Sequence, residues 1–315
     1  MCDTIQRASG METDTDGLLW VLDEGNSNCP GKLWIFNLLK NDKTERVHQF
    51  PHSVISHSND DRWLNDIVLD KTPDDYLAYI TVSESEKIIV YSRKLDKSWS
   101  VETPGRRWIS LALSPIKEPR QLYLGRAFSE EMYSVSVSEL KNEGGSAAVK
   151  FIGNWTKSPC RMLIDCSNVL YAAFALKTYL TKWNISEPFR EQRLYEAEGM
   201  GHTHWPFTFD LDANGSFWMM ERNLSEGWRK PRHKLLKAEV GAKSYIFCTS
   251  TALTTPQATA FSFNTILVWL LVCCLVLSGT LIAWLTLKMR RMQTSSRHIS
   301  MDNLVFLGSK QSSTD

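Results

Sequence analysis

The sequence predicts an all-β protein: a β-propeller with about five blades, followed by one C-terminal transmembrane helix. Three observations support this prediction. Short apolar and aromatic runs recur at a regular period through residues 1–249, the chain holds 12 Trp, 13 Phe and 9 Tyr, and Thr265–Leu287 carries no charge. Aromatic side chains are typical of sheet faces, whereas an uncharged segment of this length is typical of a membrane span.

The repeated unit is an apolar run, then an Asp or a turn, then an aromatic-rich strand. One aromatic residue marks each repeat, at spacings of 59, 44, 48 and 47 residues: Trp20, Tyr79, Tyr123, Tyr171 and Trp218. A period in the forties built from short strands is typical of propeller blades, each of which buries its faces against its neighbours. An ordinary β-sandwich is the alternative, but its strands would not repeat as a unit.

The N-terminal end leads to an expectation about the natural length of the protein. The first repeat begins almost at Met1, and Met1–Gly10 has no basic stretch followed by an apolar one, so no signal peptide is visible. A propeller ring normally closes by pairing its first and last strands. We therefore expect that the chain lacks an upstream segment with a signal peptide and about one more blade.

The C-terminal region is predicted to contain a juxtamembrane linker at 250–264, the membrane helix at 265–287 and a cytoplasmic tail at 288–315. With a rise of about 1.5 Å per residue, the helix is long enough for a hydrocarbon core of about 30 Å. Lys288 and Arg290 follow it closely, and basic flanks stay cytoplasmic. The prediction is a type I protein of the cell membrane with an extracellular propeller. A buried core helix is the alternative, but such helices seldom lack charge on every face.

Four sequons and seven Cys provide further predictions for the extracellular part. We predict N-glycosylation at the four Asn-x-Ser/Thr motifs, which are Asn154, Asn184, Asn214 and Asn223. Cys273 and Cys274 lie inside the predicted span, so five cysteines remain outside it and at least one is unpaired. Cys160 and Cys166 are close enough in sequence to close a small loop. We predict a disulfide between them and leave the other connectivity open.

Composition and motifs exclude several classes of function. The chain has 36 Lys+Arg against 35 Asp+Glu, so it has no broad basic field for binding nucleic acid. No Cys-x-x-Cys, phosphate-binding loop or nucleophile elbow occurs, and we predict no cofactor, no metal and no catalytic residue. His202 and His204 could share one strand face but lack a third ligand. Acidic residues near strand ends are interpreted as turn chemistry: Asp23, Glu24, Asp66, Asp165, Asp210 and Asp212.

Several longer motifs occur in an order that identifies a family. They begin with Leu19–Cys29 (LWVLDEGNSNC) and Lys32–Leu38 (KLWIFNL), and they continue through Leu64–Asp70 (LNDIVLD), Leu111–Pro115 (LALSP) and Phe217–Met220 (FWMM). Over residues 17–240 the chain resembles the yellow / major royal jelly protein family, which is of insect type. The resemblance implies a six-bladed propeller with a signal peptide and secretion, in agreement with the expected missing blade.

Departures from the family pattern affect two kinds of position. The family has cysteines where this chain has Asp16 and Pro73–Asp75. If the resemblance implies a disulfide between them, this chain has lost both of its cysteines. Phe207 stands where relatives place a polar Asn. The resemblance also implies a ligand site in the central channel, and we expect it at Asn65, Phe207 and Phe209.

Function is predicted in two classes, both implied by the resemblance. The first is a membrane-tethered extracellular protein, non-enzymatic and related to binding, pigmentation or cuticle, whose channel takes small aromatic amines or catechols. The alternative is a dopachrome-conversion-type isomerase of the melanin pathway. Loss of the polar Asn at Phe207 favours the first class. A third hypothesis, a metal-dependent lactonase-like propeller, would require a cage of Glu, Asn and Asp around a divalent ion.

Overall fold

Five small antiparallel sheets follow one another along the chain in the computed structural model. The structure describes residues 2–57, 63–115, 119–174, 177–196, 204–223 and 232–248. Within the chain, Met1–Ser250 forms one compact unit that holds all five sheets, and Thr251–Asp315 lies outside the described residues. In every sheet the strands are paired in sequence order, as expected for consecutive hairpins.

Each sheet is one blade, and the strands are as follows. Blade 1 contains β1 (Ala8–Thr13), β2 (Leu18–Asp23), β3 (Lys32–Asn37) and β4 (Lys43–Gln49), with the short helix η1 (Leu38–Lys40). Blade 2 contains β5 (Leu64–Lys71), β6 (Tyr76–Val82), β7 (Lys87–Ser92) and β8 (Lys97–Glu102). Blade 3 contains β9 (Trp108–Leu113), β10 (Gln121–Arg126), β11 (Glu131–Ser136) and β12 (Lys150–Asn154), with α1 (Val137–Leu140). Blade 4 contains β13 (Pro159–Ile164), β14 (Val169–Phe174), β15 (Tyr179–Asn184) and β16 (Gln192–Glu196). Blade 5 contains β17 (His204–Leu211), β18 (Ser216–Asn223) and β19 (Arg232–Glu239), and η2 (Tyr245–Phe247) follows it.

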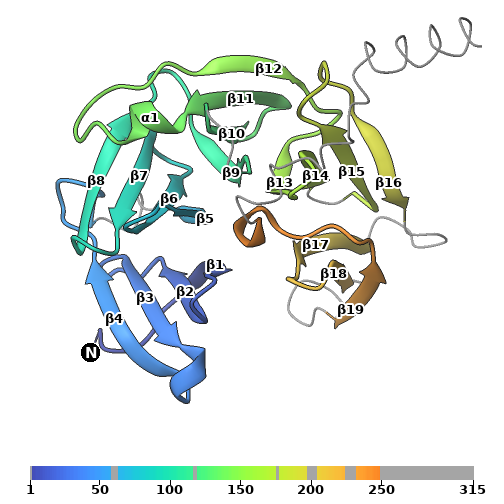
Figure 1. Ribbon diagram of the computed structural model, residues 1–315. Helices are drawn as coiled ribbons and strands as arrows, with labels where there is room; N and C mark the ends of the chain where they lie inside the picture. The colour runs from blue at the N-terminus through green and yellow to red at the C-terminus, as the bar shows by residue number, and fades with distance from the viewer. Residues whose placement is uncertain are drawn as a thin grey trace, which may run out of the picture. The chain divides into compact units, whose positions relative to one another are not determined.

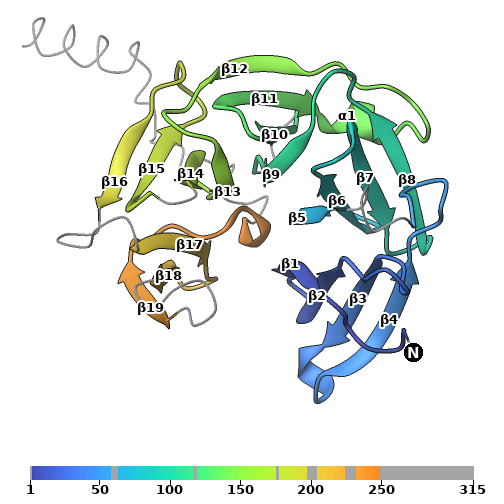
Figure 2. The ribbon, with the colours of Figure 1, turned by 180° about the vertical axis from the view of Figure 1, so that it is seen from behind.

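The first strand of each blade is the innermost one. Figures 1 and 2 show β1, β5, β9, β13 and β17 around a common centre, with the later strands of each blade farther out. Successive inner strands pack against each other, β1 on β5, β5 on β9, β9 on β13 and β13 on β17. The described part of the chain therefore forms an all-β, five-bladed propeller, with one blade for each repeat in the sequence.

The predicted fold class needs one correction, which concerns the transmembrane helix. Among the residues described, no helix combines the length and the apolar character that are needed to cross a membrane. The α-helix α1 spans only Val137–Leu140, or about 6 Å, whereas a hydrocarbon core is about 30 Å thick. The predicted linker, span and tail at 250–315 lie outside the described residues. The membrane helix is therefore not supported.

An aspartate at the end of the inner strand explains the aromatic marker in four of the five repeats. In these four blades the Oδ2 atom of the aspartate accepts a hydrogen bond from the aromatic side chain on the next strand. The pairs are Asp14 with Trp20 (2.9 Å), Asp70 with Tyr79 (3.1 Å), Asp165 with Tyr171 (2.9 Å) and Asp212 with Trp218 (3.0 Å). In blades 1, 4 and 5 the other oxygen accepts backbone N–H groups of the turn, so one carboxylate fixes both turn and ring.

Each inner strand also contains a β-bulge near its beginning. The pairing with the second strand shifts between Ala8 and Gly10 in blade 1, and equivalent shifts occur in β5, β9, β13 and β17. An extra residue changes the direction in which the following side chains point. The bulges therefore decide which residues of the inner strands face the centre.

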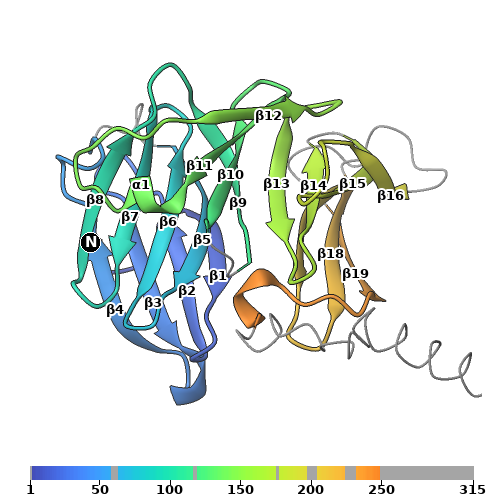
Figure 3. The same cartoon turned by 45° about the horizontal axis from the view of Figure 1, so that its top comes forward.

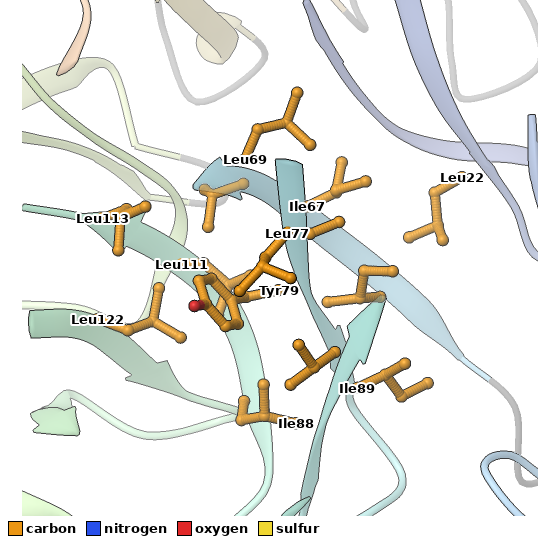
Figure 4. Packing of buried hydrophobic residues seen from close by; sticks show 14 of the residues in the cluster. Leu22, Ile67, Leu69, Leu77, Tyr79, Ile88, Ile89, Leu111, Leu113 and Leu122 are labelled. Carbon is orange, nitrogen blue, oxygen red and sulfur yellow. The ribbon is translucent and has the colours of Figure 1, made fainter. Parts of the chain in front are cut away.

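The hydrophobic core lies between neighbouring blades. Figure 4 shows Leu22 of blade 1, Ile67, Leu69 and Tyr79 of blade 2 and Leu111 of blade 3 among the residues that fill this space. Trp20 is fully buried between blades 1 and 2 and packs edge-on against Tyr91 at 5.9 Å. Burying a large aromatic side chain between sheets stabilises their packing by roughly 2–3 kcal/mol.

The segment after blade 5 returns to the centre of the molecule. Ser244 pairs with Asp165 of blade 4, and Cys248 forms a disulfide with Cys166. The η2 turn contacts β5, and the orange turn lies beside the inner strands in Figures 1 and 3. This return places Tyr245, which is 1% exposed, next to the inner strands.

Candidate functional site

Four charged side chains from four inner strands form a polar cluster at the centre of the propeller. They are Glu12 of β1, Asp66 of β5, Arg161 of β13 and Asp210 of β17. We call these four residues the central cluster. Arg161 Nη1 donates to Asp66 Oδ1 at 2.6 Å, and the charges of Glu12 and Asp210 also act on Arg161. The strands bring these residues together from positions that are far apart in the sequence.

Asp66 is the most firmly held acid of the cluster. Its Oδ2 accepts the backbone N–H of Leu111 at 2.9 Å, and its Oδ1 accepts that of Ile67 at 3.1 Å in addition to Arg161. The bulge in β5 allows this side chain to reach the neighbouring inner strand, β9. Burial raises the pKa of Asp66, and the Arg161 charge and the two N–H groups oppose that rise. Asp66 therefore orients Arg161.

Glu12 is the least satisfied acid of the cluster. It is 4% exposed, its Oε1 accepts only the Thr13 N–H at 3.2 Å, and its Oε2 has no hydrogen-bond partner. Burial, followed by the charge of Asp210, raises the pKa of Glu12 to about 8. Glu12 is therefore mostly protonated at pH 7 and has one oxygen free to interact with another molecule.

Asp210 and Arg161 complete the electrostatics of the cluster. Burial raises the pKa of Asp210, while Arg161 and the Leu211 N–H, which donates at 2.7 Å, oppose the rise. Arg161 keeps its charge because the three acids outweigh its own burial, and its Nε has no hydrogen-bond partner. The cluster thus has three acids but only one base. It has capacity for an additional positive charge or for a proton.

Tyr245 lies close enough to the cluster to interact with it electrostatically. Its hydroxyl accepts the Leu69 N–H at 2.9 Å, and burial together with the charge of Glu12 raises its pKa. The Cys166–Cys248 disulfide anchors the segment that carries Tyr245. An aromatic ring with a hydroxyl group therefore stands beside the acids.

The structure places the predicted ligand-binding residues in three different situations. Asn65 is half-buried next to Asp66, and its Nδ2 donates to the Trp63 carbonyl at 2.9 Å. Phe209 is 2% exposed and stacks on Phe217 at 5.3 Å, so it belongs to the hydrophobic core rather than to the central cluster. Phe207 lies at the bulge of β17, and its side chain is outside the described part.

The four sequons lie at different degrees of exposure. Asn154 of β12 and Asn214 of a turn in blade 5 are exposed, and Asn184 at the end of β15 is half-buried. Asn223 ends β18, and its side chain lies outside the described part. Glycosylation of the four remains a prediction.

The disulfides differ from the predicted one. Cys166 pairs with Cys248, Cys2 pairs with Cys29, and Cys160 is a free thiol that donates to the Ala173 carbonyl. The predicted Cys160–Cys166 loop is therefore wrong. The physical reason is that Cys160 lies in β13 at its bulge, whereas Cys166 lies in the turn after β13, against the returning C-terminal segment.

A polar contact occupies the position where the family resemblance implied a lost disulfide. Tyr76, the residue after Asp75, donates to Asp16 at 3.4 Å, and Arg93 pairs with Asp16 at 3.4 Å. Thr15 and Tyr76 hydroxyls are 2.5 Å apart. Blades 1 and 2 are thus joined there by hydrogen bonds and charge pairs.

Other acidic residues near strand ends have structural roles. Asp23 Oδ1 accepts three backbone N–H groups and its Oδ2 accepts the Trp34 indole, while Asp165 and Asp212 fix turns as described above. Within the described residues, no group of three His, Cys, Asp or Glu is arranged to hold a metal ion. His202 lies outside the described residues, and the side chain of His204 is not described.

Sequence reasoning missed Glu12 and Arg161, although the repeat contains a signal for both. Glu12 and Asp210 each precede the strand-end aspartate of their blade by two positions, and Asp66 and Arg161 each precede it by four. Aligning the repeats on that aspartate would have shown charged residues at positions that face the centre.

The first two blades are similar to a known protein family. Residues 7–107 match the family described as "Major royal jelly protein". The match confirms the predicted resemblance to this family within blades 1 and 2. The motif glycine Gly25 has a structural reason, because its φ is +74° and an added Cβ would lie 2.2 Å from the Cys29 carbonyl oxygen.

Solved structures with a similar arrangement are distant in sequence. A streptogramin B lyase is 10% identical with a TM-score of 0.48, covering 74% of this chain and 68% of its own. A protein of unknown function from Bacteroides caccae is 8% identical with a TM-score of 0.49, covering 76% and 80%. A catalytically inactive virginiamycin B lyase from Staphylococcus aureus with quinupristin is 9% identical with a TM-score of 0.49, covering 76% and 72%. No curated protein matches the chain.

Proposed function

We propose that this yellow-type propeller is a non-enzymatic extracellular binding protein whose central cluster takes a small aromatic amine. The observation that carries the proposal is the buried, unpartnered Oε2 of Glu12 within a group of three acids and one base. Buried polar atoms without a partner are rare in folded proteins, and they indicate a position for a ligand, a water or an ion.

The charge balance of the central cluster favours a cationic ligand over a neutral one. A buried ammonium group is stable only when it is paired and hydrogen-bonded, and ionised Glu12 and Asp210 would provide both. Ionising Glu12 at pH 7, from a pKa of about 8, costs about 1.4 kcal/mol, which a charge-assisted hydrogen bond offsets. A neutral catechol would leave Glu12 protonated and would gain no ion pair. Tyr245 supplies an aromatic surface beside the acids.

Two disulfides support an extracellular location. Cys2–Cys29 and Cys166–Cys248 join segments of blade 1 and of blades 4 and 5. Disulfides persist in oxidising compartments such as the extracellular space. A role in pigmentation or cuticle is proposed from the family resemblance, and the sequons would carry glycans in the same compartment.

Calorimetric titration tests the proposal on the full chain. Dopamine and serotonin should bind, and 4-methylcatechol, which lacks the amine, should bind at least tenfold more weakly. Glu12→Gln should weaken dopamine binding by tenfold or more, while Glu130→Gln, an exposed acid of blade 3, should leave it unchanged. Binding should also release protons, which titration in buffers of different ionisation enthalpy measures. Equal affinity for dopamine and 4-methylcatechol would contradict the proposed pairing.

The alternative of a dopachrome-converting isomerase also rests on Glu12. A carboxyl with a pKa of about 8 both accepts and donates a proton near neutral pH, as a general acid–base catalyst must. Following dopachrome absorbance in the presence of the chain and of Glu12→Gln separates the two functions. Turnover that disappears in Glu12→Gln would establish the isomerase, and binding without turnover would establish the binding protein.

A further inference from the structure

A hydrogen-bonded series of Ser98, His48 and Asp96 lies between blades 1 and 2, away from the central cluster. Ser98 Oγ is 2.9 Å from His48 Nε2, and His48 Nδ1 is 3.2 Å from Asp96 Oδ1. His48 comes from β4, Ser98 from β8, and Asp96 from the turn before β8. These are the distances and the order of a nucleophile, a base and an orienting acid.

The charges of this series put it in the state required for proton transfer. Burial lowers the pKa of His48, despite the opposing charge of Asp96, so its ring is neutral at pH 7. Partial burial would raise the pKa of Asp96, but hydrogen bonds from Tyr91 and the Arg46 charge lower it overall. The ionised Asp96 therefore accepts Nδ1–H, and the lone pair on Nε2 faces the Ser98 hydroxyl.

Two neighbours fix the orienting acid. Tyr91 donates to Asp96 Oδ1 at 3.0 Å, and Arg46 Nη1 lies 3.3 Å from the same oxygen. His48 also packs against Tyr91, with ring centroids 4.7 Å apart. The imidazole is thus held from both blades, and its direction toward Ser98 does not depend on a single contact.

A pocket opens onto the series. His48, Asp96 and Ser98 line it together with Val54, Trp99 and Glu143. Val54 and Trp99 provide an apolar wall, and Lys97 and Glu143 form an ion pair of 2.7 Å at the same place. Ser98 is 5% exposed, so only a small group can reach its hydroxyl.

The edge of β8 supplies a backbone donor for negative charge. β8 is the outermost strand of blade 2, and the Ser100 carbonyl and the Glu102 N–H bond outward to Gly144 and Gly145. Alternation along a strand turns the Ser98 N–H to the same outer edge. A backbone N–H beside the nucleophile is the kind of donor that stabilises a tetrahedral oxyanion.

We propose that Ser98, His48 and Asp96 form a second site, independent of the central cluster, which hydrolyses small esters. Ser98 Oγ attacks the carbonyl carbon while His48 Nε2 takes its proton. The bond to the alcohol oxygen breaks, and His48 returns the proton to the leaving alcohol. Water then attacks the acyl-serine with His48 as base, which releases the acid and regenerates Ser98. Asp96 acts as the positioning residue that holds the His48 tautomer.

The test uses the full chain with 4-nitrophenyl acetate and with a fluorophosphonate probe. We expect ester hydrolysis above the solvent rate and covalent labelling of the peptide that contains Ser98, identified by mass spectrometry. Ser98→Ala should abolish both, and His48→Gln should reduce both by at least a hundredfold. Ser138→Ala, which changes an exposed serine of α1 in blade 3, should change neither.

The pH profile distinguishes catalysis from a structural role. The rate should rise through the lowered pKa of His48, below 6.5, and then reach a plateau, whereas hydrolysis by hydroxide alone keeps rising. Asp96→Asn should lower the maximal rate more than it changes KM. The labelling of the unsubstituted chain does not depend on how a variant folds. Absence of the probe from the Ser98 peptide, or a Ser98→Ala rate equal to that of the unsubstituted chain, would overturn the proposal.

Discussion

Two acidic residues, one within inner strand β17 and one directly after it, have opposite properties. Asp210 lies in the central cluster, and its pKa is raised, first by burial. Asp212 directly follows this strand and has a pKa lowered to about 2, first because the Trp218 indole donates to it and then because of backbone N–H groups. Glu12 and Asp14 occupy the equivalent positions of blade 1.

The two kinds of position differ in how many hydrogen-bond donors the fold provides to the carboxylate. The strand-end acids Asp14 and Asp212 receive several donors and stabilise a turn, whereas Glu12 and Asp210 of the central cluster each accept a single backbone N–H. Glu12 has one N–H donor on Oε1 and none on Oε2, but Asp14 Oδ1 accepts the N–H groups of Asp16 and Leu18 and its Oδ2 accepts Trp20. Strand-end acids are thus satisfied within the chain, whereas Oε2 of Glu12 remains available to another molecule.

Removing Arg161, the only base of the central cluster, should cause the largest loss of stability. Arg161→Met should destabilise the protein by about 3–5 kcal/mol, because Asp66 would remain buried with its counter-charge removed. Urea unfolding followed by tryptophan fluorescence measures this. The double variant Arg161→Met with Asp66→Asn should recover a large part of the loss. A single-variant loss below about 1 kcal/mol would show that the central cluster is open to water.

Stability should depend on pH through Glu12 in the direction opposite to that of a strand-end acid. The folded-state pKa of Glu12 is about 8 against an unfolded value of 4.5, so the folded state binds more protons between these values and stability falls as pH rises. Between pH 5 and 7.5 the loss should be about 3 kcal/mol. Glu12→Gln should flatten this dependence, and Glu130→Gln should not. An unchanged slope in Glu12→Gln would mean that Glu12 is ionised in the folded state.

Asp14→Ala should cause the next largest loss of stability, by a different mechanism. The substitution leaves the buried Trp20 indole N–H and the Leu18 N–H without their acceptor, at a cost of about 2 kcal/mol. Asp14→Asn keeps one oxygen as an acceptor and should lose less. Thermal unfolding of the two variants measures the order. The structural role of strand-end acids would be in doubt if Asp14→Ala were as stable as the unsubstituted chain.

Asp212→Ala should have the smallest effect, since Trp218 is half-buried and keeps contact with water. Because folding lowers the pKa of Asp212, its contribution to stability decreases as the pH falls. The stabilisation from Asp212 is present above its ordinary value of 3.8 and is lost as pH falls through about 2. Melting temperatures of Asp212→Ala and Asp14→Ala at pH 7 give the comparison. A larger loss for Asp212→Ala would reverse the expected order.

Sequence periodicity predicted the blades because each repeat depends on local contacts. Trp20, Tyr171 and Trp218 recur since each binds an aspartate six residues before it, and such short spacings are visible in a sequence. The disulfide of Cys166 depends instead on the return of the chain from blade 5, which no spacing near Cys166 indicates.

The sites could be predicted only in part, for the same reason. Asp66 and Asp210 were noticed but interpreted as turn residues, and Glu12 and Arg161 were missed because their burial depends on neighbouring blades. Ser98 and His48 lie on outer strands of different blades, and no local motif joins them. Contacts between blades bring the residues of the candidate sites together, whereas contacts within a blade produce the sequence repeat.

The Cys166–Cys248 bond has a mechanical consequence. The covalent link spans 82 residues, so all of blade 5 lies within the loop that it closes. Tension applied beyond Cys248 would pass through the sulfur atoms to the turn after β13 and would bypass the strands of blade 5. In a single-molecule pulling measurement, blade 5 would therefore add no extension while the bond is oxidised, and it would unravel under load once the bond is reduced.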